Sequence, residues 1–284
     1  MEEAVIRVFP RKTKASPDDS LAYFGPPDLF AKADRIEISV AFTADKPKAE
    51  ALAESWQRVA PVTIGGPAYE KTGQLYPNEF IPGRYIKPGY VLTSRGCPRN
   101  CWFCNVPRLR PIAMPIPITD GWNVLDDNLL ACPEDHVRAV FAMLSRQRQR
   151  VTFTGGLEAL SLQDYQVHLM ASLKPRPACF FAYDPGDAPE TLESAARRML
   201  AAGWTRASHR LRSYCLIGYP FDTFEKAESR LKWLLSIGFT PYAMLWQPDK
   251  PSAEKWRPTP EWHSFQRRWL RPAIIHAHGR SGND

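Results

Sequence analysis

Short apolar segments alternate with segments of helical periodicity along most of the chain beyond residue 90. Several of the apolar segments are nearly continuous, as expected of strands that are buried on both faces. Strands that alternate with helices in this way predict βα units around a parallel sheet. We expect six strands, at residues 90–94, 122–126, 151–154, 179–183, 212–217 and 242–246.

The expected helices have clear boundary residues. Pro133 suits the first turn of a helix, and Gly203 and Gly238 each follow an amphipathic stripe and predict its end. The segment 105–120 differs, because its four prolines speak against a regular helix. We expect this segment to run as an extended strap.

Three cysteines follow the first expected strand at close spacing. Cys97, Cys101 and Cys104 form the pattern Cys-x3-Cys-x2-Cys on one short loop. A [4Fe–4S] cluster normally takes four protein thiolates, so three would leave one iron open to another molecule. A catalyst can use such an open position. The alternative is a zinc site with a distant histidine as the fourth ligand, although the paired units typical of zinc knuckles are missing from the sequence.

With the aromatic Phe103 before the last cysteine, this run resembles the signature of radical S-adenosylmethionine (radical SAM) enzymes. The resemblance implies a [4Fe–4S] cluster on Cys97, Cys101 and Cys104, whose open iron binds S-adenosylmethionine with Phe103 near the adenine. It implies an enzyme that reduces the sulfonium, releases a 5′-deoxyadenosyl radical and removes a hydrogen atom from its substrate. It also implies an electron donor, such as a flavodoxin or ferredoxin, and an α/β fold with a partial, open (β/α)6 barrel.

Residues that end the expected strands are candidate cofactor contacts, because chemistry in parallel βα folds gathers at the carboxyl ends of the strands. The resemblance places the methionine amine of the cofactor at Asp127 and Asn128, after the second strand. Glu158 ends a run that looks like the family's Gly-Gly-Glu motif, but this run closes the third strand. Ile217 and Gly218 close the fifth strand, where the resemblance places the adenine. A helix-capping turn and a simple strand-to-helix bend are the structural alternatives.

Four further residues are weaker candidates. Asp184 and Arg212 are expected at or near the ends of the fourth and fifth strands, where a charge can face the cofactor or the substrate. His209 and Tyr219 are possible proton donors, although each suits a structural role better. The sequence assigns no catalytic residue.

The first part of the chain has a pattern of its own. A strand at 35–42, a helix at 47–59 and a strand at 61–67 form a βαβ unit. This unit resembles the later half of the Rossmann-like cobalamin-binding domain that precedes one radical SAM subgroup, here shortened. The cobalamin-ligating Asp-x-His-x-x-Gly motif is missing and no histidine precedes His136, so we do not expect cobalamin. We therefore expect three regions: a shortened Rossmann-like segment at 1–85, the radical SAM core at 86–250 and a basic, aromatic, helical tail at 251–284.

The net charge of +7 permits contact with a polyanion without demonstrating it. In the expected tail, basic and aromatic residues interleave, which suits either base stacking or an amphipathic helix packed on the barrel, and we favour the helix. A nucleic acid or nucleotide is the first substrate hypothesis, and a peptide or small metabolite is the second. A non-catalytic iron–sulfur or zinc protein is the alternative from another class.

The sequence also bears on the compartment. No apolar run reaches the length needed to cross a membrane, and the acidic start lacks the features of a signal peptide. Six cysteines, three of them in the loop, fit a reducing compartment better than a disulfide framework. We therefore expect a cytoplasmic protein without a membrane partner. The other cysteines, Cys132, Cys179 and Cys215, are expected to be buried side chains and not further ligands.

Overall fold

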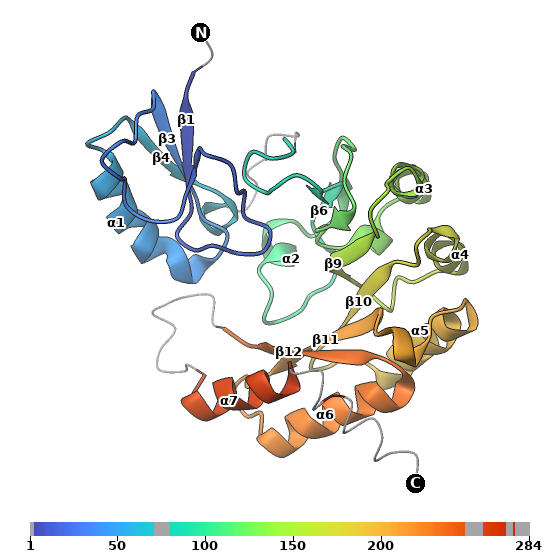
Figure 1. Ribbon diagram of the computed structural model, residues 1–284. Coiled ribbons are helices and arrows are strands. Elements are labelled where there is room, and N and C mark those ends of the chain that lie inside the picture. The colour runs from blue at the N-terminus through green and yellow to red at the C-terminus, as the bar shows by residue number, and fades with distance from the viewer. Residues whose placement is uncertain (1–2, 71–79, 248–257, 271–274, 276–284) are drawn as a thin grey trace. The chain divides into compact units, whose positions relative to one another are not determined.

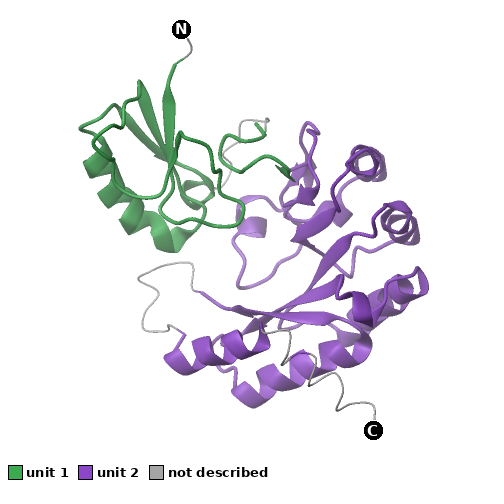
Figure 2. Cartoon of the chain, in the orientation of Figure 1, with its two compact units in different colours: residues 1–90, 249–254 green, residues 91–248, 255–284 purple. Residues whose placement is uncertain are grey.

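The computed structural model describes residues 3–70, 80–247, 258–270 and 275. The chain divides into two compact units (Figure 2). Unit 1 comprises Met1–Tyr90 and Asp249–Glu254, and unit 2 comprises Val91–Pro248 and Lys255–Asp284.

Unit 1 contains a four-stranded parallel sheet in the order β2-β1-β3-β4. The expected βαβ unit is confirmed as β3 (Arg35–Ser39), α1 (Lys46–Trp56) and β4 (Val62–Gly65). Two strands that were not predicted from the sequence, β1 (Val5–Val8) and β2 (Ala22–Tyr23), precede this unit and extend its sheet. Two short 3-10 helices, Thr43–Asp45 and Pro67–Tyr69, complete the described elements of this unit.

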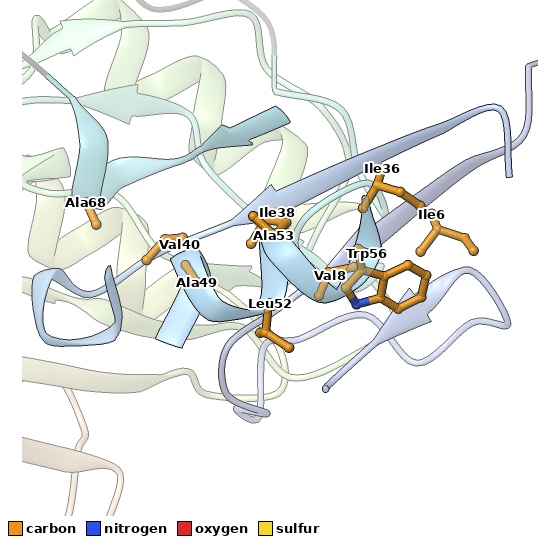
Figure 3. Packing of buried hydrophobic residues seen from close by; sticks show 10 residues of the cluster. All are labelled: Ile6, Val8, Ile36, Ile38, Val40, Ala49, Leu52, Ala53, Trp56 and Ala68. Carbon is orange, nitrogen blue, oxygen red and sulfur yellow. The ribbon is translucent and has the colours of Figure 1, made fainter. Parts of the chain in front are cut away.

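The core of unit 1 forms where α1 packs on the sheet (Figure 3). Ile36 and Ile38 alternate along β3 with half-buried residues and lie on the buried face. Trp56, at the last turn of α1, is fully buried against Tyr23, with the two rings edge to face at 5.0 Å. Its indole N–H donates to the Gly25 carbonyl at 2.9 Å, so the one polar atom of the ring is satisfied inside the core.

Unit 2 contains a six-stranded sheet in which all six expected strands are found. The sheet order is β12-β11-β10-β9-β8-β5, so neighbours in the chain are neighbours in the sheet. Every pair from β8 to β12 is parallel, which confirms a mixed α/β fold with parallel sheets. The strands are β5 (Tyr90–Val91), β8 (Asn123–Val124), β9 (Thr152–Leu157), β10 (Ala178–Tyr183), β11 (Leu211–Ile217) and β12 (Thr240–Leu245).

Four helices connect consecutive strands of unit 2 and follow one another along one side of the sheet (Figure 1). A fifth helix, α7 (Pro260–Trp269), lies at the edge strand β12, where Gln266 Nε2 donates to the Ala243 carbonyl at 3.1 Å. Its Phe265 and Trp269 are buried, which is the packing expected of an amphipathic helix. The four connecting helices are α3 (Glu134–Ser145), α4 (Asp164–Ser172), α5 (Pro189–Ala201) and α6 (Phe224–Ile237), and 3-10 helices span Leu129–Ala131 and Arg206–Ser208.

The segment after the cysteines differs in part from expectation. A single helical turn, α2 (Val106–Leu109), is present where no helix was expected. The turn accommodates Pro107 because the first residues of a helix have no intrahelical acceptor for their N–H groups. Beyond it the chain is extended, and β7 (Met114–Pro115) pairs antiparallel with β6 (Ser94–Arg95).

Crossing the hydrocarbon core of a lipid bilayer takes about 20 consecutive apolar residues in a helix. Within the part of the chain that the structure describes, no helix is both long and apolar enough to do so.

Candidate functional site

The loop with Cys97, Cys101 and Cys104 leaves the sheet at the carboxyl end of its first strand, β5. Its first turn is tied to the following strap, because the Cys97 N–H donates to the Arg110 carbonyl at 3.0 Å. Gly96 has a φ of +97°, and a Cβ there would lie 2.0 Å from the Ile112 carbonyl oxygen. Only glycine fits this position without moving the backbone, so the sequence Gly-Cys fixes where the loop begins.

Asp126, two residues after β8, holds the base of the loop. Its carboxylate is buried and accepts the Thr93 N–H at 2.7 Å and the hydroxyls of Thr93 and Ser94 at 2.5 and 2.6 Å. Burial raises the pKa of Asp126 to about 6, although these donors act against the rise. Asp126 therefore joins the ends of β5 and β8 from inside the protein.

Asp127 and Asn128, two of the expected cofactor contacts, touch the cysteine loop directly. Asp127 Oδ2 accepts the Gly96 N–H at 2.8 Å and lies 3.3 Å from Arg95 Nε. The Asn128 side-chain amide donates to Cys97 Sγ at 3.4 Å and to Glu158 Oε2 at 2.8 Å. Asn128 Oδ1 is buried without a hydrogen-bond partner among the described residues. The structure thus leaves one acceptor beside the first cysteine unused.

Glu158 belongs to the same group of residues, although the sequence placed it after a different strand. Gly155, in β9, makes this possible, because a Cβ there would lie 2.3 Å from the Asp126 carbonyl oxygen. Besides Asn128, Glu158 Oε2 accepts the Ser161 hydroxyl at 2.5 Å. The ends of β8 and β9 are therefore joined by an amide-carboxylate contact next to Cys97.

Arg99, inside the cysteine loop, pairs with carboxylates from two strand ends. Its Nε lies 3.1 Å from Glu158 Oε1, and its NH2 lies 2.5 Å from Asp187 Oδ1. Asp187 in turn accepts the Asp184 N–H at 2.8 Å, which orders the turn after β10. Burial and the charge of Asp187 raise the pKa of Asp184 to about 7. The ion pairs of Arg99 therefore hold the loop at the carboxyl ends of β9 and β10.

Aromatic contacts connect the loop with residues after β11 and β12, the last two strands of the same sheet. Trp102 packs edge to face on Phe103 at 5.4 Å between ring centroids. It also lies 6.0 Å from Tyr219, after β11, and 5.9 Å from Trp246, after β12. The loop that begins at β5 thus touches the carboxyl ends of the last two strands.

Ile217 and Gly218 lie at the end of β11, apart from the polar group around Cys97. Ile217 is fully buried, and its carbonyl accepts the Trp246 N–H at 3.0 Å. Gly218 lies against the indole of Trp262 from α7, which a Cβ would approach to 3.0 Å. Its N–H donates to Asp222, whose carboxylate pairs with Arg230 at 2.8 Å. This turn connects to the cysteine loop through the aromatic contact of the neighbouring Tyr219 with Trp102.

Two weaker candidates lie elsewhere. Arg212 is the second residue of β11 and pairs with Phe180 and Thr240, so it lies toward the amino ends of the strands. Arg212 was expected at the start of the strand 212–217, and the structure places it there, one residue after the first residue of β11 and far from the cysteine loop at the carboxyl edge. His209 ends a 3-10 turn before β11, and its Nδ1 lies 3.2 Å from the Thr240 hydroxyl.

All six cysteines are free thiols. Burial raises the pKa of Cys101, and it raises the pKa of Cys104 to about 11. Cys132, Cys179 and Cys215 are buried, as expected. No three His, Cys, Asp or Glu side chains within the described ranges are placed to hold a metal ion. This finding concerns single ions, since the thiolates of a cluster bind separate irons.

Three residues that help to hold the loop were not predicted from the sequence. Arg99 and Trp102 lie between the cysteines, and Asp187 follows β10. The pairing of Arg99 with Asp187 could have been predicted, because a charged residue in the loop and an acidic residue after a strand lie at the same edge of a parallel sheet. Trp102 carried no comparable signal, because Tyr219 and Trp246, its partners outside the loop, are far away in sequence. No known family model matches this chain, and no curated protein matches it significantly.

Proposed function

We propose that this chain is a radical SAM enzyme that carries a [4Fe–4S] cluster on Cys97, Cys101 and Cys104. The observation that carries the proposal is the contact of these cysteines with the strand ends. Asn128 and Asp127 hold the beginning of the loop, and Arg99 ties its middle to two carboxylates. These contacts fix the loop at the carboxyl edge of a parallel sheet, and βα folds carry their active sites at that edge.

The donor atoms fit the proposed group. Thiolates are the ligands that iron–sulfur clusters take, and three of them leave one iron for another molecule. Asn128 Oδ1, buried beside Cys97 with no partner among the described residues, is an acceptor that suits an ammonium group such as the one S-adenosylmethionine carries. When bound, the reduced cluster supplies the electron that cleaves the sulfonium of S-adenosylmethionine and so starts hydrogen abstraction from the substrate.

The residues of the chain have separate roles in this proposal. Asp126 fixes the base of the loop through Thr93 and Ser94. Asn128 orients the Cys97 sulfur and offers its carbonyl oxygen to the cofactor amine. The aromatic contacts of Trp102 hold the loop against the ends of β11 and β12. We assign no general acid or base.

We further propose that the six-stranded sheet is the partial barrel of this family. The contacts of Trp102 with Tyr219 and Trp246 support this, because β5 and β12 are the two edges of the sheet. Five gaps between strands in a flat sheet would separate its edges by roughly 24 Å. A sheet that curves brings those edges closer and lets one short loop reach both.

The partners and compartment follow from the same proposal. The enzyme needs a one-electron donor of the flavodoxin or ferredoxin type. Free thiols at all six cysteines fit a reducing compartment such as the cytoplasm. A nucleotide or nucleic acid is the proposed substrate class, and a peptide or small metabolite is the alternative. Steep weakening of nucleic-acid binding with rising salt would support a polymeric substrate, whereas a flat response would contradict it.

Anaerobic reconstitution tests the proposal. We expect about four irons and four sulfides per chain, and formation of 5′-deoxyadenosine with dithionite and S-adenosylmethionine. Substituting Cys97, Cys101 and Cys104 together by alanine should abolish both, whereas the matched variant Cys132→Ala should retain them. Iron and sulfide without 5′-deoxyadenosine would support an electron relay instead. A single zinc ion held by the loop would contradict the cluster altogether.

A further inference from the structure

The face of the six-stranded sheet opposite its helices carries aromatic rings on three neighbouring strands. Phe180 of β10 stacks on Tyr214 of β11 at 5.0 Å between centroids. Tyr214 meets Tyr242 of β12 edge to face at 5.6 Å, and these two residues are register partners. The Tyr214 hydroxyl donates to the Thr154 carbonyl at 2.9 Å, which fixes the orientation of its ring. The rings form one ordered surface across three strands.

This surface is partly open. Side chains on the other face of β10 pack on the helices, as Tyr183 does on Trp233 of α6 at 4.7 Å. On the aromatic face, Tyr242 is 37% exposed and Met244, two residues further along β12, is 41% exposed. Tyr242 and Met244 therefore leave apolar surface open to a ligand on this face.

Arg212 adds a positive charge at one end of this surface. It lies two residues before Tyr214 on the same face of β11, with its guanidinium 5.2 Å from the centre of the Phe180 ring. Its Nε donates to the His209 carbonyl at 2.9 Å, and this hydrogen bond does not use the two terminal nitrogens of the guanidinium. Within the described ranges no carboxylate pairs with Arg212, whereas Arg99 and Arg230 both have one.

We propose that this face binds a small ligand that combines a planar ring with an anionic group. The ring would lie against Tyr242 and Met244, where the surface is most exposed. The anionic group would meet the terminal nitrogens of Arg212, which match a phosphate or carboxylate in a bidentate contact. Tyr242 lies one strand across and two residues along from Arg212, a separation of roughly 8 Å on the sheet, which one mononucleotide or aryl carboxylate can span.

The site lies on the sheet that also carries the cysteine loop at its carboxyl edge. That the ligand is the substrate of the reaction rests on the proposed function, whereas its binding does not. A single arginine and one group of aromatic side chains can bind one anionic group and one ring. A polymer would need further cations that follow its backbone, and the described part of this face provides only Arg212.

Isothermal titration calorimetry tests the proposal by measuring how tightly each probe binds to the reconstituted protein in the absence of oxygen. The probes are the four ribonucleoside 5′-monophosphates and 4-hydroxyphenylacetate, which distinguish a phosphate source of the charge from a carboxylate source. We expect saturable binding of at least one of them. Adenosine lacks the charge and ribose 5-phosphate lacks the aromatic ring, so each should bind at least about tenfold more weakly, as expected when one charged or stacking contact is lost.

Variants then place the ligand on this face. Arg212→Gln should weaken binding by about tenfold or more, and Arg212→Lys by less, since it keeps the charge without the fork. Tyr242→Leu should weaken the ring-bearing probes alone and leave ribose 5-phosphate unchanged. Arg148→Gln removes the same charge from an exposed turn and should leave binding unchanged. Arg212 is only partly buried, so its variants remain informative even if Tyr242→Leu does not fold.

The proposal is overturned if none of the probes binds, or if Arg148→Gln weakens binding as much as Arg212→Gln. Tighter binding of single-stranded RNA than of any mononucleotide, insensitive to Arg212, would also overturn it. Binding without 5′-deoxyadenosine formation would remove the proposed function and leave this site in place. Formation of 5′-deoxyadenosine without binding of any probe would do the reverse.

Discussion

The side-chain amide of Asn128 lies 3.4 Å from the sulfur of Cys97, so the segment after β8 touches the first cysteine of the loop. The same amide donates to Glu158 at the end of β9. Cys97 is therefore positioned by two strand ends as well as by its own loop. This relationship makes the loop part of the sheet's carboxyl edge, and it can be tested by substitutions that leave the cysteines intact.

Substituting Asn128 by alanine should weaken both the loop and the cofactor site. The variant loses the contacts with Cys97 and Glu158, and one missing partner in a buried site costs about 1–3 kcal/mol of unfolding free energy. We also expect a lower iron content after reconstitution and weaker binding of S-adenosylmethionine. Chemical unfolding, iron analysis and equilibrium dialysis measure the three effects. Asn100, exposed in the same loop, provides the matched control, and equal losses in Asn100→Ala would contradict a special role of Asn128.

Substituting Gly96 by alanine should disrupt the loop more than backbone conformation alone explains. The new Cβ would lie 2.0 Å from the Ile112 carbonyl oxygen, so the strap has to move. Gly186 has nearly the same φ, +98°, but a Cβ there meets nothing within 4 Å. Gly186→Ala should therefore cost about 1 kcal/mol from the left-handed conformation, and Gly96→Ala clearly more. Thermal unfolding and iron content compare the two variants, and similar values in both would mean that the strap yields easily.

Substituting Arg99 by glutamine should lower stability and loosen the loop. Glu158 and Asp187 would both lose their cation, and we expect a cost of about 1–3 kcal/mol, given partial screening by solvent. Arg146 makes an exposed ion pair with Asp120 at 3.9 Å, so Arg146→Gln should change stability by less than about 0.5 kcal/mol. Urea unfolding at low and high salt measures both variants. If added salt removed the whole effect of Arg99→Gln, the contacts would be those of a surface pair.

Much of the fold follows from local patterns in the sequence. The strands from β9 to β12 were predicted because each is a short apolar segment that follows an amphipathic one, and β5 and β8 because they are short apolar segments on either side of the strap. Gly238 was recognised as the end of α6 because a left-handed residue closes a helix best when it is glycine, and its φ is +107°. β1 and β2 were missed because they are short and separated by a long stretch without periodicity.

The candidate site was predictable to the level of strand ends and no further. Asp127, Asn128 and Glu158 were named because polar residues follow strands there, and the structure does place them together beside Cys97. Their contacts depend on which strands are neighbours and on the distances between backbones, which a linear pattern does not contain. For the same reason the sequence could not show that Arg212, at the start of β11, lies away from the polar group around Cys97.

The buried carboxylate of Asp126 should make stability depend on pH in an identifiable way. Burial raises its pKa from 3.8 to about 6, so between these values the folded protein holds the proton more tightly than the unfolded chain does. The contribution of Asp126 to the free energy of unfolding is therefore fully present below about pH 4 and decreases as the pH rises through about 6, by up to about 3 kcal/mol. Chemical unfolding at several pH values measures it.

Substituting Asp126 by asparagine removes this titration and lowers stability at every pH, because one acceptor of the loop's hydroxyls is lost. The stability difference between wild type and Asp126→Asn should therefore be largest near pH 4 and shrink toward pH 7. Asp120→Asn, at an exposed carboxylate, should show a small difference that does not change over this range. A constant difference for Asp126→Asn from pH 4 to pH 7 would mean that Asp126 is ionised throughout. In that case the hydrogen bonds from Thr93 and Ser94 outweigh the cost of burying its charge.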